Sequence, residues 1–155
     1  AIGYLEQGVE IARELGNKRF QAIHLGNLGV VLGSLERWEE AEKRLTSSID
    51  LCKKVFPTAA GAFSAYLAVI FAHQQQFEEA MKHIQYGEEI VQDSPDLLSN
   101  FMCNKAKVLH LSQQPEQARD ALNQAITIAD QIKTGQHSEL AQIIVKTEQF
   151  ISSTI

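Results

Sequence analysis

The chain has 155 residues, of which 45% are apolar and 21% charged, a composition typical of one globular domain. Its formal net charge is -5 and its Lys and Arg residues form no cluster, which argues against binding to DNA or RNA. The two cysteines, Cys52 and Cys103, lie far apart without a Cys-x-x-Cys motif, so the sequence gives no support for a zinc or redox site.

Apolar residues recur at helical spacing, and strand-like runs of β-branched residues are missing, so we predict an all-α chain. Breaks are predicted at "FPT" (56–58), "DSPD" (93–96) and "KTGQHS" (133–138), with Gly135 as a helix C-cap and Ser138 as an N-cap. In chain order, the predicted helices are 1–15, 19–34, 38–55, 59–74, 77–92, 96–112, 115–133 and 138–153.

The second predicted helix contains three glycines, Gly26, Gly29 and Gly33. A glycine inside a helix costs about 1 kcal/mol relative to alanine. Close packing against a neighbour, where a side chain would not fit, offsets this cost. The glycines therefore predict that another helix approaches closely.

A pattern of apolar and small residues occurs three times with nearly constant spacing. Its copies are Leu25-x-x-Leu28-Gly29-x-x-Leu32 with Ala41-x-x-x-Leu45, Ser64-x-x-Leu67-Ala68-x-x-Phe71 with Ala80-x-x-x-Ile84, and Met102-x-x-Lys105-Ala106-x-x-Leu109 with Ala118-x-x-x-Leu122. The spacing between the first and the second half of the pattern is the same in every copy. This behaviour is typical of helix-turn-helix units stacked in an array.

In these motifs, and in "ARELGNKRFQAIHLGNLG" (12–29), the chain resembles the tetratricopeptide repeat family, especially its long-repeat branch of Leu-Gly-Asn adaptors and bacterial signalling proteins. The resemblance implies an all-α, right-handed solenoid of antiparallel helix pairs with about eight helices. We expect one domain, cut from a larger protein. It would comprise a half repeat at 1–18, repeats at about 19–57, 58–95 and 96–134, and a terminal capping helix at 138–153.

The resemblance places Gly29, with its equivalents Ala68 and Ala106, where the two helices of a repeat touch. It does not explain Gly26 and Gly33. We place Gly26 on the ligand-facing side, as a bare patch that lets a ligand backbone approach.

Two residues depart from the repeat pattern. Lys105 replaces a leucine, and we expect either that its stem covers apolar surface while its charge reaches solvent or that the third repeat is looser. Glu148 replaces a large apolar residue, which fits a terminal helix with a polar outer face.

No group of residues in the sequence indicates catalysis. The five histidines form no pair at metal-ligand spacing, and "GNLGVVLG" (26–33) lacks the strand and the Lys-Ser/Thr ending of a phosphate loop. Glutamate pairs are expected on solvated faces, in ion pairs such as Glu39–Lys43 and Glu78–Lys82. We expect no enzyme, no cofactor and no metal site.

In the tetratricopeptide repeat family, the first helices of successive repeats line a concave groove that holds a peptide or a helix. The helix face opposite the packing stripe is the candidate binding surface. Its residues in the three repeats are Ile23, Asn27, Val30, Ser34, Tyr66, Val69, His73, Asn100, Asn104 and Lys107. The resemblance implies that Asn27 and Asn104 hold a ligand backbone, since an amide both donates and accepts hydrogen bonds. Lys107 is the one cation on this face, too few for a clamp on chaperone tails.

These features favour a protein–protein interaction module of a signalling or regulatory protein, with a protein or peptide partner in the groove. We expect no nucleic acid partner and a cytoplasmic location. We also expect no membrane insertion, because the most apolar window, 58–72, is too short to span a bilayer. One alternative is a structural role, with self-association through the exposed helix at the start of the array. Another is a sensory domain that binds a small effector, which a well-enclosed pocket under Tyr66 would favour.

Overall fold

The computed structural model describes residues 1–132 and 138–153. Within these ranges the chain forms eight α-helices and no strand. The helices are α1 (Ile2–Glu14), α2 (Lys18–Ser34), α3 (Trp38–Val55), α4 (Pro57–His73), α5 (Phe77–Val91), α6 (Pro95–Leu111), α7 (Pro115–Gln131) and α8 (Glu139–Ser152). None of them is long and apolar enough to cross a membrane.

The predicted helices are all present, and the all-α prediction is confirmed. Ser138 caps α8 as predicted, because its hydroxyl accepts a hydrogen bond from the Ala141 N–H at 3.1 Å. The predicted C-cap Gly135 and the predicted helix end at 133 lie outside the described residues.

The breaks predicted at 56–58 and 93–96 are too long. Pro57 and Pro95 are already the first residues of α4 and α6, as Pro115 is of α7. Proline fits this position because its fixed φ suits a helix and its missing N–H is not needed there.

The turns inside the three helix pairs share one backbone conformation. Glu36, Gln75 and Gln113 occupy equivalent positions between paired helices and have φ of 59°, 62° and 62°. Residues other than glycine rarely adopt this left-handed backbone conformation, so its recurrence at one position shows that the three turns are built alike.

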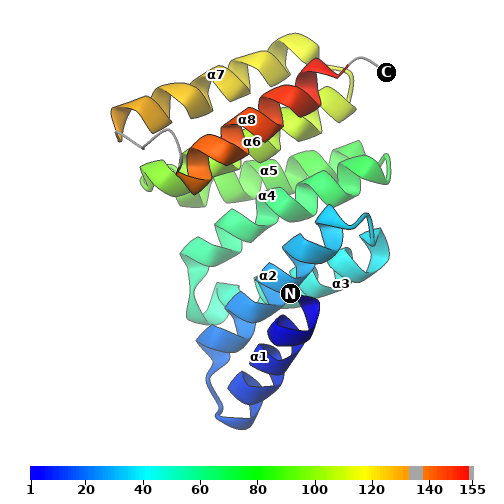
Figure 1. The fold of residues 1–155 in the computed structure, drawn as a ribbon, viewed down its shortest axis with the longest axis vertical. Helices are drawn as coiled ribbons and strands as arrows, with labels where there is room; N and C mark the ends of the chain where they lie inside the picture. The colour runs from blue at the N-terminus through cyan, green and yellow to red at the C-terminus, as the bar shows by residue number, and fades with distance from the viewer. Residues whose placement is uncertain (133–137, 154–155) are drawn as a thin grey trace.

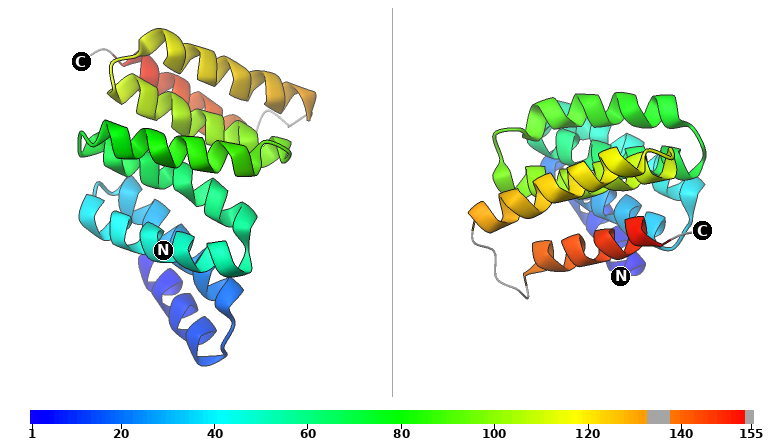
Figure 2. Two further views of the ribbon diagram at one scale, coloured as in Figure 1. Left: turned by 180° about the vertical axis from the view of Figure 1, so that it is seen from behind. Right: turned by 90° about the horizontal axis from the view of Figure 1, so that it is seen from above.

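The helices stack along the long axis of the molecule, from α1 at one end to α7 and α8 at the other (Figure 1). The antiparallel pairs are α2 with α3, α4 with α5, and α6 with α7. The view from behind brings α3, α5 and α7 toward the viewer, while α8 lies on the opposite side (Figure 2). The chain is thus an α-solenoid of antiparallel helix pairs, as predicted.

Small residues bring the paired helices together. A Cβ added to Gly29 would lie 2.6 Å from Leu45 Cγ and 3.2 Å from the Ala41 carbonyl oxygen, so only glycine fits this contact between α2 and α3. The equivalent Ala68 and Ala106 are completely buried. The predicted role of Gly29 is confirmed.

The interpretation of Gly26 as a bare patch for a ligand is wrong. Gly26 is buried, and an added Cβ would lie within 2.5 Å of three ring atoms of Phe63, a residue of α4. Two helical turns later, a Cβ on Gly33 would lie 2.9 Å from Ile70 Cδ1, also from α4. Both glycines receive bulky side chains of the next repeat.

The junction between the first two helix pairs is open on one side, between α2 and α4. There α4 packs mainly on α3 and touches α2 at few points, whereas α6 packs more on α4 than on α5, and α8 more on α6 than on α7. Phe56 alone separates α3 from α4, while 92–94 separate α5 from α6. The one-residue connection keeps α4 beside α3 and leaves α2 and α4 apart over most of their length.

The two departures from the repeat pattern lie in polar contacts. Lys105 is half-buried and its Nζ lies 2.8 Å from Glu88 Oε2, so its stem is covered while its charge is paired. Glu148 lies 3.3 Å from Arg119 on α7. Beside it Val145 is 54% exposed, at the position where earlier repeats have Gly29 and Ala68.

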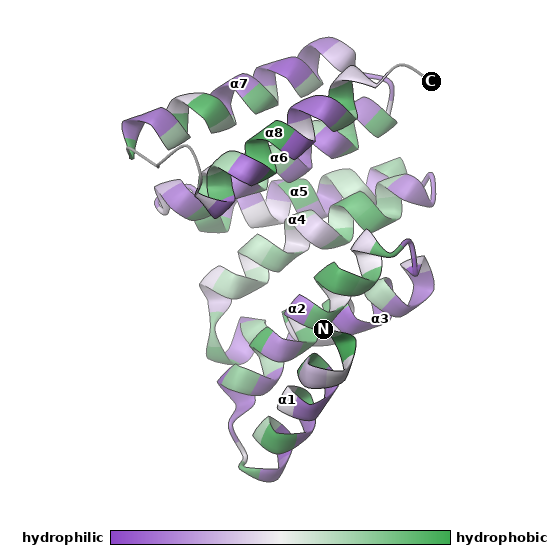
Figure 3. Ribbon diagram, in the orientation of Figure 1, coloured by the Kyte–Doolittle hydropathy of each residue, from purple (hydrophilic) through white to green (hydrophobic). Residues whose placement is uncertain are grey.

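Hydrophilic and hydrophobic residues alternate along the helices that face solvent on one side. In Figure 3, α7 alternates between hydrophilic and hydrophobic segments, whereas α4 is mostly white to green. The predicted Glu78–Lys82 ion pair is present at 3.2 Å. The Glu39–Lys43 pair does not form within the described residues, where Arg37 pairs with Glu40 at 2.7 Å instead.

Candidate functional site

A pocket of about 250 Å³ lies at the open junction, where α2, α3, α4, α6 and α8 face one another. Its walls are mainly apolar and include residues from all five helices. They are Gly29, Val30, Gly33, Ser34, Trp38, Leu45, Tyr66, Val69, Ile70, His73, Asn104, Lys107 and Phe150. Most of these residues lie on α2, α4 and α6, the first helices of the pairs, which are predicted to line the groove.

The pocket brings together seven of the ten candidate binding residues. These seven are Val30, Ser34, Tyr66, Val69, His73, Asn104 and Lys107. Asn100 lies just outside it, where its amide donates a hydrogen bond to the Tyr66 hydroxyl at 3.0 Å. Ile23 packs against the core and Asn27 is exposed, so these two do not reach the pocket. Binding by any of the ten stays a prediction.

Aromatic rings form one end of the pocket. The Trp38 and His73 rings are stacked, with centroids 4.3 Å apart and planes 16° apart. Phe150 meets His73 and His110 edge-on, at centroid distances of 6.2 and 5.5 Å. Edge-on and stacked contacts of this kind hold rings in fixed orientations. These ring contacts link α3, α4 and α8 at this end of the pocket.

Sequence analysis did not identify Trp38 and Phe150 as candidate residues. The signal for Phe150 was available, because it occupies in α8 the position that Ser34 and His73 occupy in α2 and α4. Trp38 is the first residue of α3, and its sequence position predicts only the start of a helix. Its ring reaches the pocket because α2 and α3 are joined by a tight turn.

Two polar side chains face the pocket without a protein partner. Asn104 is only 3% exposed, and its amide makes no hydrogen bond within the described part of the chain. Lys107 is half-buried and forms no ion pair with a described residue. Burial lowers the pKa of Lys107, the nearby Cys103 thiol opposes this effect, and Lys146 adds to it.

Burial also lowers the pKa of His73, with Glu36 opposing the effect and Lys107 adding to it. No carboxylate is among the described residues that line the pocket. Among the described residues, no cluster of His, Cys, Asp and Glu could hold a metal ion. The arrangement suits recognition of a ligand by one cation and one amide set in apolar walls.

Both cysteines are buried free thiols, and burial raises the pKa of each. A raised pKa disfavours the thiolate, which is the nucleophilic form. Neither cysteine therefore lies in surroundings that activate a thiol.

Comparisons with known proteins agree with this fold. A family model described as tetratricopeptide repeat matches residues 22–58. Two solved structures, of nearly identical TPR-like repeats assigned to a kinesin light chain of Podosopora anserina, resemble the chain with a TM-score of 0.60 and 17% sequence identity. Each similarity covers 96% of this chain and 76% of that chain, and one of the two structures carries a single substitution. No curated protein matches the sequence.

These similarities show a tetratricopeptide-repeat fold. Tetratricopeptide repeats generally mediate protein–protein interaction. The matches do not bear on the long-repeat branch or on the Leu-Gly-Asn adaptors, so that part of the resemblance stays a prediction.

Proposed function

We propose that the chain binds a peptide or a helix of a partner protein along the face formed by α2, α4, α6 and α8. The observation that carries this proposal is the convergence of seven candidate residues on one pocket in that face. Surfaces used for binding combine concave apolar walls with a few polar groups that fix orientation. The pocket has both features.

The partner segment would use the face in two ways. One of its apolar side chains would enter the pocket against Val30 and Val69, where it loses contact with water. Its backbone would run past the exposed Asn27, whose amide can both donate and accept hydrogen bonds. We further propose that this module serves a cytoplasmic signalling or regulatory protein, as the sequence resemblance implies.

The test is capture of partners from a lysate by the chain and by two variants of matched chemistry. Val30→Asp/Val69→Asp places charges in the pocket wall, and Val145→Asp places one on the outer face of α8, where Val145 is 54% exposed. We expect the first variant to lose a partner that the second retains, with helical content unchanged in circular dichroism. Loss by Val145→Asp alone would move the binding surface to the end of the array.

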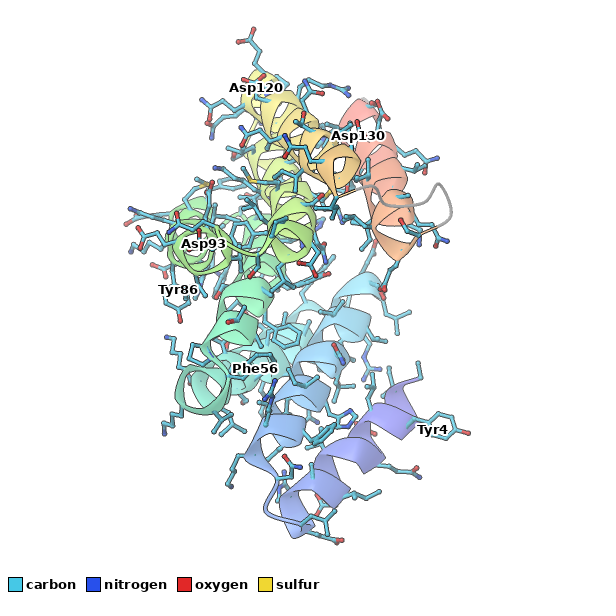
Figure 4. All side chains as sticks on the ribbon, turned by 90° about the vertical axis from the view of Figure 1, so that its left-hand side faces the viewer. Tyr4, Phe56, Tyr86, Asp93, Asp120 and Asp130 are labelled. Carbon is cyan, nitrogen blue, oxygen red and sulfur yellow. The ribbon has the colours of Figure 1, made fainter. Side chains whose placement is uncertain are left out.

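A second candidate function is self-association through α1. Tyr4, Ile11 and Leu15 are 83%, 56% and 77% exposed and lie along one face of α1. Figure 4 shows Tyr4 projecting away from the helix into solvent. If this face pairs with a second copy, sedimentation velocity at rising concentrations will show a dimer that Ile11→Asp/Leu15→Asp abolishes. A monomer at all concentrations would exclude this candidate.

A further inference from the structure

The size of the pocket limits what can enter it. Its volume is about 250 Å³. A cavity of about 150 Å³ holds one benzene molecule, and drug-sized ligands occupy roughly 300 Å³ or more. The pocket therefore has room for one ring with a short substituent, and it is too small for a folded segment of a partner.

The charge of the pocket is opposite to that of the whole protein. The chain carries a net charge of -5, yet the described residues that line the pocket include Lys107 and no carboxylate. Lys146, on α8, is close enough to lower the pKa of Lys107 further. An anion entering the pocket would meet an unpaired cation in apolar surroundings, where charge attraction is stronger than in water.

Two polar groups in the pocket lack partners, and one kind of ligand satisfies both. Asn104 is only 3% exposed and its amide makes no hydrogen bond to a described residue, so the amide is free to bond a ligand in the pocket. A carboxylate has two oxygens, so one can accept from the Lys107 ammonium and the other from the Asn104 N–H. A phosphate dianion would leave its second charge uncompensated among apolar walls.

The remaining walls favour an apolar body. Trp38, Tyr66 and Phe150 line the pocket together with aliphatic side chains of α2 and α4. Aromatic walls bind rings through edge-on and stacked contacts in addition to the removal of apolar surface from water. The ligand should therefore join one negative charge to a body of about one ring.

We propose that this pocket binds a small organic monocarboxylic acid, with its carboxylate on Lys107 and Asn104 and its apolar body between Trp38, Tyr66 and Phe150. The proposal concerns a free small molecule and does not depend on capture of a partner peptide.

The test uses Trp38, the one tryptophan in the sequence, as a fluorescent reporter inside the pocket. The chain is titrated with phenylacetate, 3-phenylpropionate and hexanoate, and in parallel with the neutral amide of each acid. We expect a saturable change in Trp38 emission with at least one acid, and binding of its amide at least about tenfold weaker, as loss of a charge-assisted hydrogen bond implies.

Two lysine variants decide whether the charge is responsible. Lys107→Met should weaken binding of the acid by about tenfold or more, because the carboxylate loses its cation. Lys105→Met is the matched control, since Lys105 already pairs with Glu88 at 2.8 Å and does not line the pocket. Val30→Trp, which fills the pocket, should abolish binding, measured by calorimetry so that the added tryptophan does not interfere.

Three results with the free acids would overturn the proposal. They are the absence of a saturable response to all three acids up to their solubility, equal binding of acid and amide, and binding that survives Lys107→Met. Binding of an acidic peptide without binding of any free acid would also overturn it. Any of these results leaves the proposed partner binding intact if the lysate experiment succeeds, so the two failures can be told apart.

Discussion

Replacing Gly26 by alanine tests how α2 meets α4. The new methyl group would lie within 2.5 Å of three ring atoms of Phe63, whereas carbon atoms in contact normally stay about 3.5–4.0 Å apart. The ring would have to move by about 1 Å or more. Because Phe63 is only 8% exposed, it has little free space into which it can move.

The expected cost follows from two opposing effects. Forcing extra volume into a packed contact costs about 1–3 kcal/mol. Alanine gains about 1 kcal/mol over glycine in a helix. The clash involves a whole ring, so we take the upper part of the first range and expect net destabilisation of about 1–2 kcal/mol. For a chain of this size, that lowers Tm by about 2–8 °C.

Two other glycines provide the control. Gly3 in α1 has no atom within 4 Å of an added Cβ, so Gly3→Ala should be neutral or stabilising by up to about 1 kcal/mol. The new methyl group of Gly33→Ala would lie 2.9 Å from Ile70 Cδ1, the end of a flexible side chain, and 3.9 Å from Ala41 Cβ, so this variant should lie between the two. The predicted order of stability is Gly3→Ala, then Gly33→Ala, then Gly26→Ala.

The assay is urea unfolding of each variant, followed by circular dichroism. Phe63→Leu combined with Gly26→Ala should recover about 1 kcal/mol of the loss relative to the sum of the single changes, because the smaller side chain leaves room for the methyl group. If Gly26→Ala is as stable as Gly3→Ala, the Phe63 ring does not pack on Gly26 and the described junction is wrong.

Three further predictions concern the pocket and its supports. Lys107→Met should raise the free energy of unfolding at pH 7 by up to about 1 kcal/mol, because it removes a half-buried cation that has no ion pair with a described residue; equal or lower stability in urea would contradict this. Burial lowers the pKa of His73 and His83 below 6.5, the value that applies in the unfolded chain. On acidification the unfolded chain therefore binds protons before the folded chain does. The contribution of the two histidines to stability is present in full above pH 6.5 and should be lost as the pH falls to 5. His73→Asn/His83→Asn should show a smaller fall in Tm between these pH values, and an unchanged fall would assign the effect to other groups. Ser138→Ala removes the N-cap of α8 and should cost about 1 kcal/mol. Amide exchange in α8 should then be faster than in the unsubstituted chain, while exchange in α6 stays unchanged.

The parts of the fold that depend on local periodicity could be predicted. The presence of the helices, the contact of Gly29 with α3 and the common face of Val30 and Val69 all follow from residue spacing within a repeat. The role of Gly26 could not, because it depends on the tilt of α4 against α2. That tilt is set by the single residue Phe56 between two helices, and spacing within a helix carries no information about it.

The candidate site shows the same division. Seven residues of one predicted face meet in the pocket, because a helix face is a local property. Phe150 could have been added by extending that face to α8. Trp38 could not, since its position depends on how the turn after α2 directs the start of α3. The unpaired state of Asn104 likewise appears only when neighbouring helices are in place.

The sparse contact between α2 and α4 has a mechanical consequence. The α2 and α4 helices share fewer contacts than α4 with α6 or α6 with α8, and the pocket lies between them. Bending there changes the separation of Val30 on α2 from Tyr66 on α4 and so changes the width of the pocket. A ligand bound between these two residues would restrict the bending. A ligand in this one pocket is therefore expected to influence the curvature of the array at this junction.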